Sequence, residues 1–434
     1  MKAKLPERLY LITLLVVFIG IIFHAPLSVG LGVLFPDYSL LIKSWKEILM
    51  CLLIPLAILI VTKRKLWHEL MSDWIFRIIL IYTALHLFVA ALFWQGIAPT
   101  LAGLAIDLRY ILFFGLVYVI VRVLPQARRS IVIAAIVGAF VVTLFAVLQL
   151  FLPPDILKYI GYSKETIAPY LTVDKNPDYI RVNSTLRGPN PLGAYAGMVL
   201  GLLAAAIVRL KLNLKDKKVL VPGIILALAS SVALWISYSR SALFAGIITV
   251  LIVVGIRVAG KTSWRGWTMF GVGVIVVAAG LIAARDTSFV SNVILHENQN
   301  GGSEISSNEG HVESLQYGIT QLFREPLGSG VGSTGSASLF GAQPTIVENQ
   351  YLFVGHEIGW LGLVLFLVLF VLILIRLWKR KKDWLALGLF ASGVGLGLIG
   401  ILLPVWVDDT VSIIWWGLAA TALAGGVYDR RKTK

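Results

Sequence analysis

The chain has 434 residues and a formal net charge of +15, and 58% of its residues are hydrophobic against 14% charged. This composition excludes an ordinary soluble domain, in which about a quarter of the residues are charged. The single cysteine, Cys51, excludes a disulfide framework and a cysteine-based metal site. The positive charge does not require a nucleic-acid partner, because a membrane protein with basic cytoplasmic loops carries the same excess.

Apolar runs recur along the whole sequence, and each is long enough to cross about 30 Å of hydrocarbon as a helix of about 20 residues. Backbone groups in lipid must be hydrogen-bonded internally, so these runs predict an all-α polytopic membrane protein. Twelve spans are predicted, at about residues 9–34, 45–62, 74–95, 100–121, 131–152, 188–208, 219–237, 241–256, 266–284, 347–375, 384–405 and 411–428.

Basic residues gather in alternate connections between these spans. With the N-terminus placed in the cytoplasm, the cytoplasmic segments hold 26 of the 38 Lys and Arg residues. The segments read "MKAKLPER", "TKRK", "RVLPQARR", "RLKLNLKDKK", "RVAGKTSWR", "RLWKRKK" and "DRRKTK". Such a bias predicts that both termini are cytoplasmic.

Two long connections fall on the extracytoplasmic side, at residues 153–187 and 285–346, the second directly before span ten. Both are poor in Lys and Arg, and the second contains the turn-rich tract "HENQNGGSEISSNEG". Loops of this length are usually functional or disordered. No internal repeat or soluble domain is evident, so residues 1–434 are interpreted as a single membrane domain whose distinctive chemistry faces outward.

Two arginines at the extracytoplasmic ends of spans are candidates for binding an anion. Arg187 precedes "GPNPLG", a turn-forming set that predicts a helix from about Pro191. A guanidinium beside a helix N-terminus suits an anionic ligand, because both present N–H donors. Arg240 lies in the short turn "SYSRSALFAG" between two apolar runs, where an arginine is a functional candidate by default. The alternatives are a snorkelling arginine at Arg187 and a helix C-terminal cap at Arg240.

The second long connection ends in a predicted amphipathic helix. Within "NEGHVESLQYGITQLFREPLGSGVGS", the residues His311, Gln316, Ile319 and Phe323 have helical spacing, and "EPLGSGVG" ends the pattern. His311 is expected near the N-terminus of this helix, at the membrane surface. Histidine exchanges protons near neutral pH, although a structural role is the alternative.

Span ten opens with "VENQYLFVGHEIGWLG", which holds Glu348, His356 and Glu357. If the helix starts at Glu348, steps of 100° per residue place three glycines below Glu348 on one face. Small residues allow close packing, so this face is expected against protein. Glu357 falls on the opposite side, which excludes a Glu348–Glu357 catalytic pair and predicts that Glu357 holds neighbouring helices.

Other polar residues are predicted to be structural. Asp107 and Arg109 in span four point in different directions on a helix, and each requires a partner at membrane depth. His86 is a lone polar group in span three. Asp408 and Asp409, in the turn before span twelve, are expected to be solvated.

The ordered set "RVNSTLRGPNPLGAYAG", "SYSRSALFAG", "GHVESLQYGITQLFREPLGSGVG" and "ENQYLFVGHEIGWLG" resembles the O-antigen ligase and O-antigen polymerase family. The resemblance covers about residues 180–375, an O-antigen ligase-like core, and the twelve-span layout suits the family over the whole length. It implies an integral membrane glycosyltransferase at the outer face of the bacterial inner membrane. The implied donor is a glycan on undecaprenyl diphosphate, the acceptor is a lipid or another glycan, and no cofactor or metal is implied.

The resemblance also implies roles for particular residues. Arg187 and Arg240 match arginines expected to grip the donor diphosphate. Glu348 stands where many members have a histidine proposed as the base, and His311 stands where many have an arginine. We therefore expect Glu348 and His311 to approach each other and share the base role, and either fits as the base itself. Asn349, Tyr351 and Glu357 are expected to support the site structurally.

The chemistry requires these residue types. Transfer from a sugar-1-diphosphate needs stabilisation of the departing diphosphate, which two arginines provide without a metal, and a base near the acceptor hydroxyl. A single displacement inverts the anomeric centre. The main rival is a transporter or flippase of lipid-linked oligosaccharide, whose site is expected near the bilayer midplane. A peptidoglycan glycosyltransferase, an inactive homologue and a non-catalytic scaffold are further alternatives.

Overall fold

The computed structural model describes residues 4–173, 175–210, 216–259, 307–342 and 344–425. Over these residues the chain is nearly all-α. The helices are α1 (Leu5–Gly20), η1 (Ile21–Phe23), α2 (His24–Leu34), η2 (Pro36–Tyr38), α3 (Ser39–Lys43), α4 (Trp45–Lys63), α5 (Trp67–Ser72), α6 (Trp74–Leu92), α7 (Ile97–Val123), α8 (Ala127–Leu148), η3 (Ile156–Ile160), α9 (Pro189–Arg209), α10 (Lys217–Ile236), α11 (Arg240–Ala259), α13 (Ser307–Arg324), α14 (Gly335–Ser338), α15 (Gln350–Lys379), α16 (Trp384–Ile399), η5 (Val405–Val407) and α17 (Asp409–Ala424).

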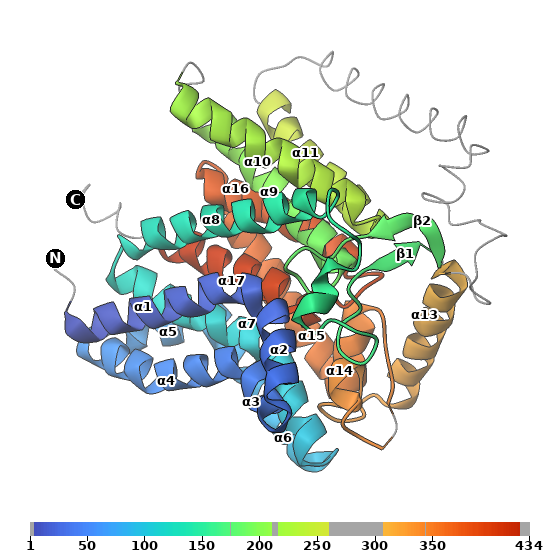
Figure 1. The fold of residues 1–434 in the computed structure, drawn as a ribbon. Coiled ribbons are helices and arrows are strands. Elements are labelled where there is room, and N and C mark those ends of the chain that lie inside the picture. The colour runs from blue at the N-terminus through green and yellow to red at the C-terminus, as the bar shows by residue number, and fades with distance from the viewer. Residues whose placement is uncertain (1–3, 174, 211–215, 260–306, 343, 426–434) are drawn as a thin grey trace.

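The long helices form a bundle with two different ends (Figure 1). One end, here called the terminal end, holds the N- and C-terminal parts of the chain. The opposite end, here called the site end, holds the strands β1 (Leu171–Val173) and β2 (Asn176–Arg181) and the helix α13. The antiparallel pair β1–β2 lies in the first long connection and was not predicted from the sequence.

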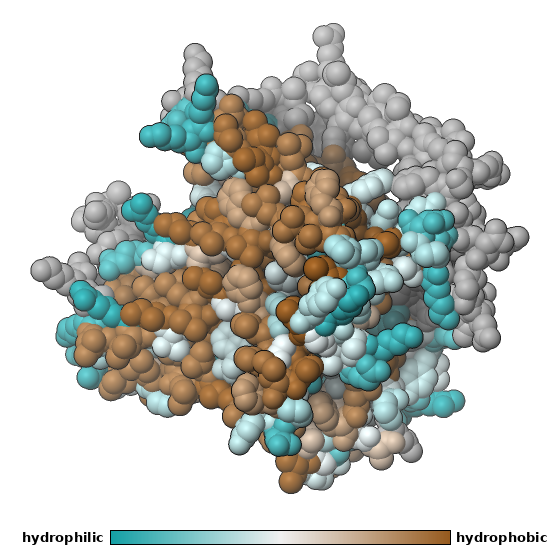
Figure 2. Space-filling view, in the orientation of Figure 1, coloured by the Kyte–Doolittle hydropathy of each residue, from teal (hydrophilic) through white to brown (hydrophobic). Residues whose placement is uncertain are grey.

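Nine helical segments of the described chain are long and apolar enough to cross a membrane. Figure 2 shows apolar residues along the visible sides of the bundle and hydrophilic ones towards its ends. Eleven of the twelve predicted spans coincide with helices, although α16 and α17 fall below the length of a full crossing. The predicted span at 266–284, and residues 285–306 of the second long connection, lie outside the described residues.

The core of the bundle surrounds α17. Every residue of this helix is buried, as expected for a helix that is apolar on all sides. Its main neighbour is α7, and Trp406, Trp415 and Trp416 pack against one another at the centre with ring centroids 5.2–5.8 Å apart. These contacts fix the position of the start of α17.

The amphipathic helix predicted around His311 is confirmed as α13. Span ten differs from its prediction in two ways. Its helix α15 begins at Gln350, capped by the Asn349 side chain, so Glu348 lies before the helix. The helix is also broken at Ile358 and Gly359, where the backbone is not helical. The angular count from Glu348 is therefore wrong, because it assumes one continuous helix.

The break in α15 is filled by the loop that follows α13. The Trp360 N–H donates to the Pro326 carbonyl at 2.9 Å, and the Ser329 N–H donates to the His356 carbonyl at 2.7 Å. Gly359 has φ +70°, and a Cβ there would lie 2.4 Å from the Pro326 oxygen. Glycine is required at this position because the loop backbone leaves no room for a side chain.

Candidate functional site

The first two polar stretches meet at the site ends of α9 and α11. The helix α9 begins at Pro189, two residues before the predicted start, since proline at the first helical position needs no N–H partner. Arg181 joins the stretches, because its Nε donates to the Ser237 carbonyl at 2.9 Å and its Nη2 donates to Asn190 Oδ1 at 2.7 Å. Gly193 permits this approach, since a Cβ there would lie 2.6 Å from Ser237 Oγ.

Both predicted anion-binding arginines lie at helix N-termini in this region. Arg187 is exposed just before α9, and its Nη2 donates to Ser336 Oγ at 3.2 Å. Arg240 is half-buried and is the first residue of α11, three residues after the C-cap of α10. A cation at a helix N-terminus opposes the helix dipole, and an anion bound there would relieve this repulsion.

A pocket of about 320 Å³ opens beside Arg187. It combines a cation, an amide, a hydroxyl and a carboxylate with apolar walls, and it lies among α9, α14 and the connection from α16 to α17. The residues that line it are Arg187, Asn190, Pro191, Ala194, Ser336, Ile399, Leu403, Pro404, Val405, Val407, Asp408 and Val411. Such a mixture of a few polar groups in an apolar cavity is typical of ligand sites.

Asp408 is a component of this pocket that the sequence did not reveal. It is half-buried rather than solvated, and its Oδ1 accepts from the Val411 N–H at 2.8 Å as the N-cap of α17. Burial and the neighbouring Asp409 raise the pKa of Asp408 to about 6, against the lowering effect of Arg109 and Arg187. Asp408 and Arg187 thus line one cavity and interact electrostatically.

Asp409 is buried and belongs to a cluster of charges beneath the pocket. It forms ion pairs with Arg109 of α7 and, at 2.9 Å, with His24 Nε2. Lys46 Nζ lies 3.7 Å from the same carboxylate and 3.1 Å from Glu47 Oε1. The prediction that Asp409 is solvated is therefore wrong, and the buried partner required by Arg109 is Asp409.

The third and fourth stretches also meet. The Glu348 N–H donates to Ser314 Oγ at 3.0 Å, and a Cβ at Gly318 would touch the Leu352 side chain, so α13 packs on the start of α15. His311 lies in α13 one turn before Ser314, about 4.5 Å along the helix axis. Its side chain is outside the described part of the structure, and the relay between His311 and Glu348 stays a prediction.

Glu348 is half-buried and is not among the residues that line the pocket. The next two residues nevertheless connect it to one wall. Asn349 Nδ2 donates to the Ile401 carbonyl at 2.6 Å, and the Gln350 N–H donates to the Gly400 carbonyl at 2.8 Å. The start of α15 thus holds the connection between α16 and α17 that carries Asp408.

The residues expected to support the site make bonds to other elements. Tyr351 Oη donates to the Gly397 carbonyl of α16 at 2.7 Å. Glu357 is buried, and its Oε1 accepts at 3.1 Å from the Gly332 N–H, which belongs to the glycine-rich loop after α13 (residues 328–333). Its carboxyl group also lies close enough to Asp107 of α7 to interact electrostatically. Glu357 therefore joins α15 to that loop and faces α7.

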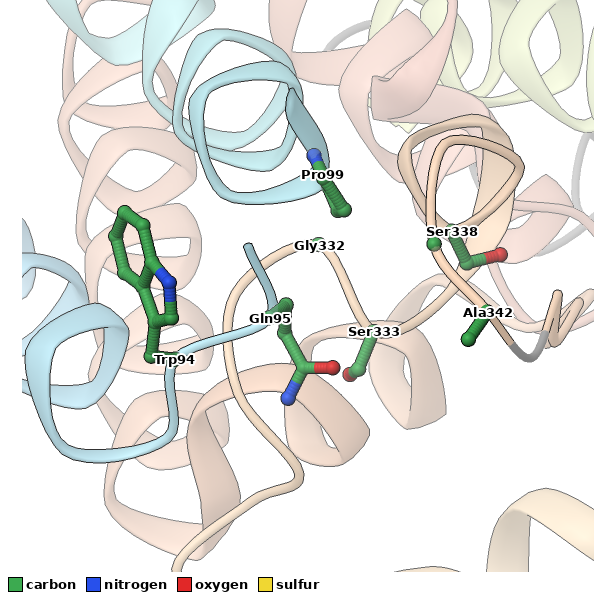
Figure 3. A pocket seen from close by; sticks show the side chains of 8 residues that line it. Trp94, Gln95, Pro99, Gly332, Ser333, Ser338 and Ala342 are labelled. Atoms are coloured by element: carbon green, nitrogen blue, oxygen red, sulfur yellow. The ribbon is translucent and has the colours of Figure 1, made fainter. Parts of the chain in front are cut away.

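The same loop borders a second pocket of about 250 Å³ (Figure 3). Trp94, Gln95 and Pro99 form one side, and the glycine-rich loop and α14 form the other. Gln95 Nε2 donates to the Ser329 carbonyl at 2.6 Å and fastens the loop to the connection between α6 and α7. No charged side chain lines this pocket, so it offers an anion less than the pocket beside Arg187 does.

These arrangements define a class of protein. The chain is a multi-pass α-helical membrane protein, and at one end of its bundle lies a largely apolar pocket with a few polar and charged residues. Within the described ranges, no group of three or more His, Cys, Asp and Glu side chains is placed to hold a metal ion. A scan of the chain against protein-family models finds no match, and a search among curated proteins finds none either.

Proposed function

We propose that this protein is a membrane glycan transferase of the O-antigen ligase and polymerase kind. It moves a glycan from an undecaprenyl-diphosphate donor to a lipid or glycan acceptor, without a metal and with inversion at the anomeric carbon. The proposal places the site end at the extracytoplasmic face of the bacterial inner membrane, with both termini in the cytoplasm, as the charge bias favours.

One observation carries the proposal. The pocket beside Arg187 brings a guanidinium, the N-terminus of α9 and a carboxylate to one cavity at an end of the bundle. An enzyme that cleaves a glycosyl diphosphate needs this combination of anion binding and proton acceptance. A site for transport alone does not require a base beside the anion.

The parts of the donor have matching partners in the structure. The diphosphate would lie against Arg187 and the N-termini of α9 and α11, which present backbone N–H donors. Arg240 opens α11 and would contact the diphosphate from that side. The apolar polyprenyl chain would follow the exposed apolar side of α11, to which Phe244 and Ile247 belong.

The test uses the full chain, purified and reconstituted with a lipid-diphosphate-linked glycan donor and an acceptor. Arg187→Ala and Arg240→Ala are each expected to lower transfer by about 10²–10³-fold, the cost of removing one group that stabilises developing charge. Arg129→Ala is the matched control, because Arg129 is an exposed arginine on α8 at the terminal end. Full transfer by both site variants would contradict the assignment.

The rival flippase predicts a different result in the same vesicles. A flippase carries the lipid-linked glycan across the bilayer and leaves the bond between glycan and diphosphate intact. Transport without any new glycosidic bond would therefore overturn the proposed transferase and favour the transporter.

A further inference from the structure

We propose that Asp408 is the general base that accepts the proton of the acceptor hydroxyl. This inference rests on the proposed transfer reaction and gives Asp408 the role that the sequence suggested for Glu348 and His311. Asp408 lines the same pocket as Arg187, whereas Glu348 is not among the residues that line it. A base acts only within hydrogen-bond reach of the reacting hydroxyl or through one water, so it must share the cavity of the donor diphosphate.

Hydrogen bonds and an ion pair from other elements fix the residues on both sides of Asp408. The Trp406 N–H donates to Gln350 Oε1 at 2.8 Å. Arg109 binds both the Val407 carbonyl and the Asp409 carboxylate, and Thr410 Oγ1 donates to the Ile21 carbonyl at 3.2 Å. These bonds come from α15, α7 and η1, so Asp408 is fixed in position before any ligand binds.

The surrounding charges suit a base at neutral pH. Arg187 lines the same pocket and interacts electrostatically with Asp408, as does Arg109 of α7, and Asp409 is the next residue in the chain. His24 and Lys46 form ion pairs with the Asp409 carboxylate. Burial and Asp409 outweigh the arginines and bring the pKa of Asp408 to about 6. The group is thus mostly ionised at pH 7 and can accept a proton, and it loses this capacity as the pH falls below 6.

The step balances without a further reagent. The acceptor hydroxyl oxygen forms a bond to the anomeric carbon, and the bond from that carbon to the diphosphate oxygen breaks. The diphosphate leaves with the electron pair of the broken bond, and Arg187 and the N-terminus of α9 bind the resulting anion. The hydroxyl proton passes to the Asp408 carboxylate.

Asp408 also caps α17, and a capping role alone must be separated from catalysis. The substitution Asp408→Asn makes this separation, since it keeps a side-chain oxygen for the Val411 N–H and asparagine caps helices as well as aspartate does. Asp408→Ser retains a cap by a second route. The matched control is Asp216→Asn, because Asp216 caps α10 through the Lys218 N–H and is exposed.

The experiment measures kcat, donor binding and thermal unfolding of the reconstituted full chain between pH 5 and 8, with the lipid-diphosphate-linked glycan as probe. Wild type is expected to lose kcat below about pH 6. Asp408→Asn and Asp408→Ser should each lower kcat by about 10²–10⁴-fold, the usual contribution of a general base, and abolish this pH dependence. Donor binding and the unfolding temperature should stay near those of wild type and Asp216→Asn.

Three outcomes would overturn the assignment. If wild type transfers glycan and the folded Asp408 variants transfer it at a similar rate, Asp408 is only a cap. If the folded variants lose donor binding in proportion to kcat, Asp408 positions the donor and is not the base. If wild type binds the donor but forms no glycosidic bond at any pH, the proposed function itself is wrong, and the base assignment falls with it.

Discussion

Arg109 joins residues that lie far apart in the sequence, since its partners Val407 and Asp409 are about 300 positions away. All of these groups are buried or nearly so, and the guanidinium therefore serves as both counter-ion and hydrogen-bond donor. Removing one member of such a pair leaves an uncompensated charge in the protein interior, which costs more than the pair itself contributes. The position of Asp408 in the pocket depends on Arg109, because Arg109 binds the residues on either side of Asp408 in the chain.

Arg109→Ala is expected to lower the free energy of unfolding by about 3–5 kcal/mol, because Asp409 loses its main counter-ion. The control is Arg128→Ala, whose pair with Asp383 at 2.7 Å is partly exposed and should contribute about 0–1 kcal/mol. Denaturant unfolding in detergent micelles measures both. Equal losses in the two variants would show that burial does not govern the strength of these pairs.

Glu357 presents a different buried carboxyl group. Glu357 Oε2 and Asp107 Oδ2 are both buried, and the carboxyl groups of Glu357 and Asp107 are close enough to share a hydrogen bond when one of them is protonated. The nearest basic side chain to this pair in the described structure is His86, whose Nε2 is 3.8 Å from Asp107 Oδ2. Burying two negative charges side by side is unfavourable. We therefore expect the protein to tolerate a neutral side chain in place of Glu357.

Glu357→Gln is therefore expected to retain the stability of wild type, since the glutamine oxygen still accepts from the Gly332 N–H. Glu357→Ala leaves that buried N–H without its partner and should cost about 1–3 kcal/mol. The difference in unfolding free energy between Glu357→Gln and Glu357→Ala, obtained by denaturant unfolding, measures the contribution of the hydrogen bond from the Gly332 N–H. A large loss in Glu357→Gln would mean that the charge itself stabilises the fold.

At this scale, sequence reasoning identified the residues that need partners but not the partners. Arg109 was expected to require one, and its partner Asp409 was expected to be solvated. Whether a carboxylate in a turn faces water or a buried guanidinium depends on which helices surround it, and no local pattern near Asp409 carries that information.

The element with the largest departure from its prediction is α15. Its apolar run predicts one helix, and the sequence contains glycines that are equally compatible with helix packing or with a break. The loop after α13 decides between these, because the Gly328 and Gly330 backbone lies against Glu357 and Gly359. The break is a tertiary effect, and for this reason the helical count from Glu348 failed.

Gly359→Ala is expected to destabilise the protein by at least about 1–3 kcal/mol, because the backbone at φ +70° and ψ −170° is nearly restricted to glycine. The added Cβ would also overlap the Pro326 oxygen. Gly115→Ala in α7 is the control, since no atom lies within 4 Å of its new Cβ, and helix propensity favours alanine by about 1 kcal/mol. Opposite signs of the two changes in unfolding free energy are expected.

Equal stability of Gly359→Ala and wild type would show that α15 can run straight without the loop in its break. The same pair of variants separates this backbone requirement from any general effect of removing a glycine from a membrane helix.

In the whole molecule, charge is arranged differently at the two ends of the bundle. The terminal end carries ion pairs that join neighbouring helices, among them Arg122–Glu69, Arg376–Asp73 and Arg128–Asp383. The site end instead presents Arg187 and Arg240 at helix N-termini, and Arg187 lines a pocket there. Among the basic segments that the structure describes, residues 63–65, 122–129 and 376–382 fall at the terminal end, which fits the proposed cytoplasmic position of that end.

This orientation is testable with a membrane-impermeant thiol reagent on intact cells. In a Cys51→Ser background, Ala342→Cys beside the second pocket is expected to be labelled from outside. Ser72→Cys, exposed at the end of α5, should react only after the membrane is opened. The reverse pattern would invert the proposed topology and place the pocket in the cytoplasm.

Composition and periodicity predicted the helical class and the position of most spans, because a membrane imposes length and apolarity on each segment separately. They did not predict the pocket, which combines Arg187, Ser336 and Asp408 from three distant parts of the chain. The sequence predicts which residues lie near a helix end. Which of these ends come together depends on how the helices pack.

The proposed function requires that a glycan pass from a lipid diphosphate to an acceptor in the pocket beside Arg187. The most direct measurement is mass spectrometry of donor and acceptor after incubation with the purified, reconstituted wild-type chain. We predict one released polyprenyl diphosphate for each glycosidic bond formed, with the anomeric configuration inverted. Intact donor and unmodified acceptor, under conditions in which the donor binds, would contradict the claim.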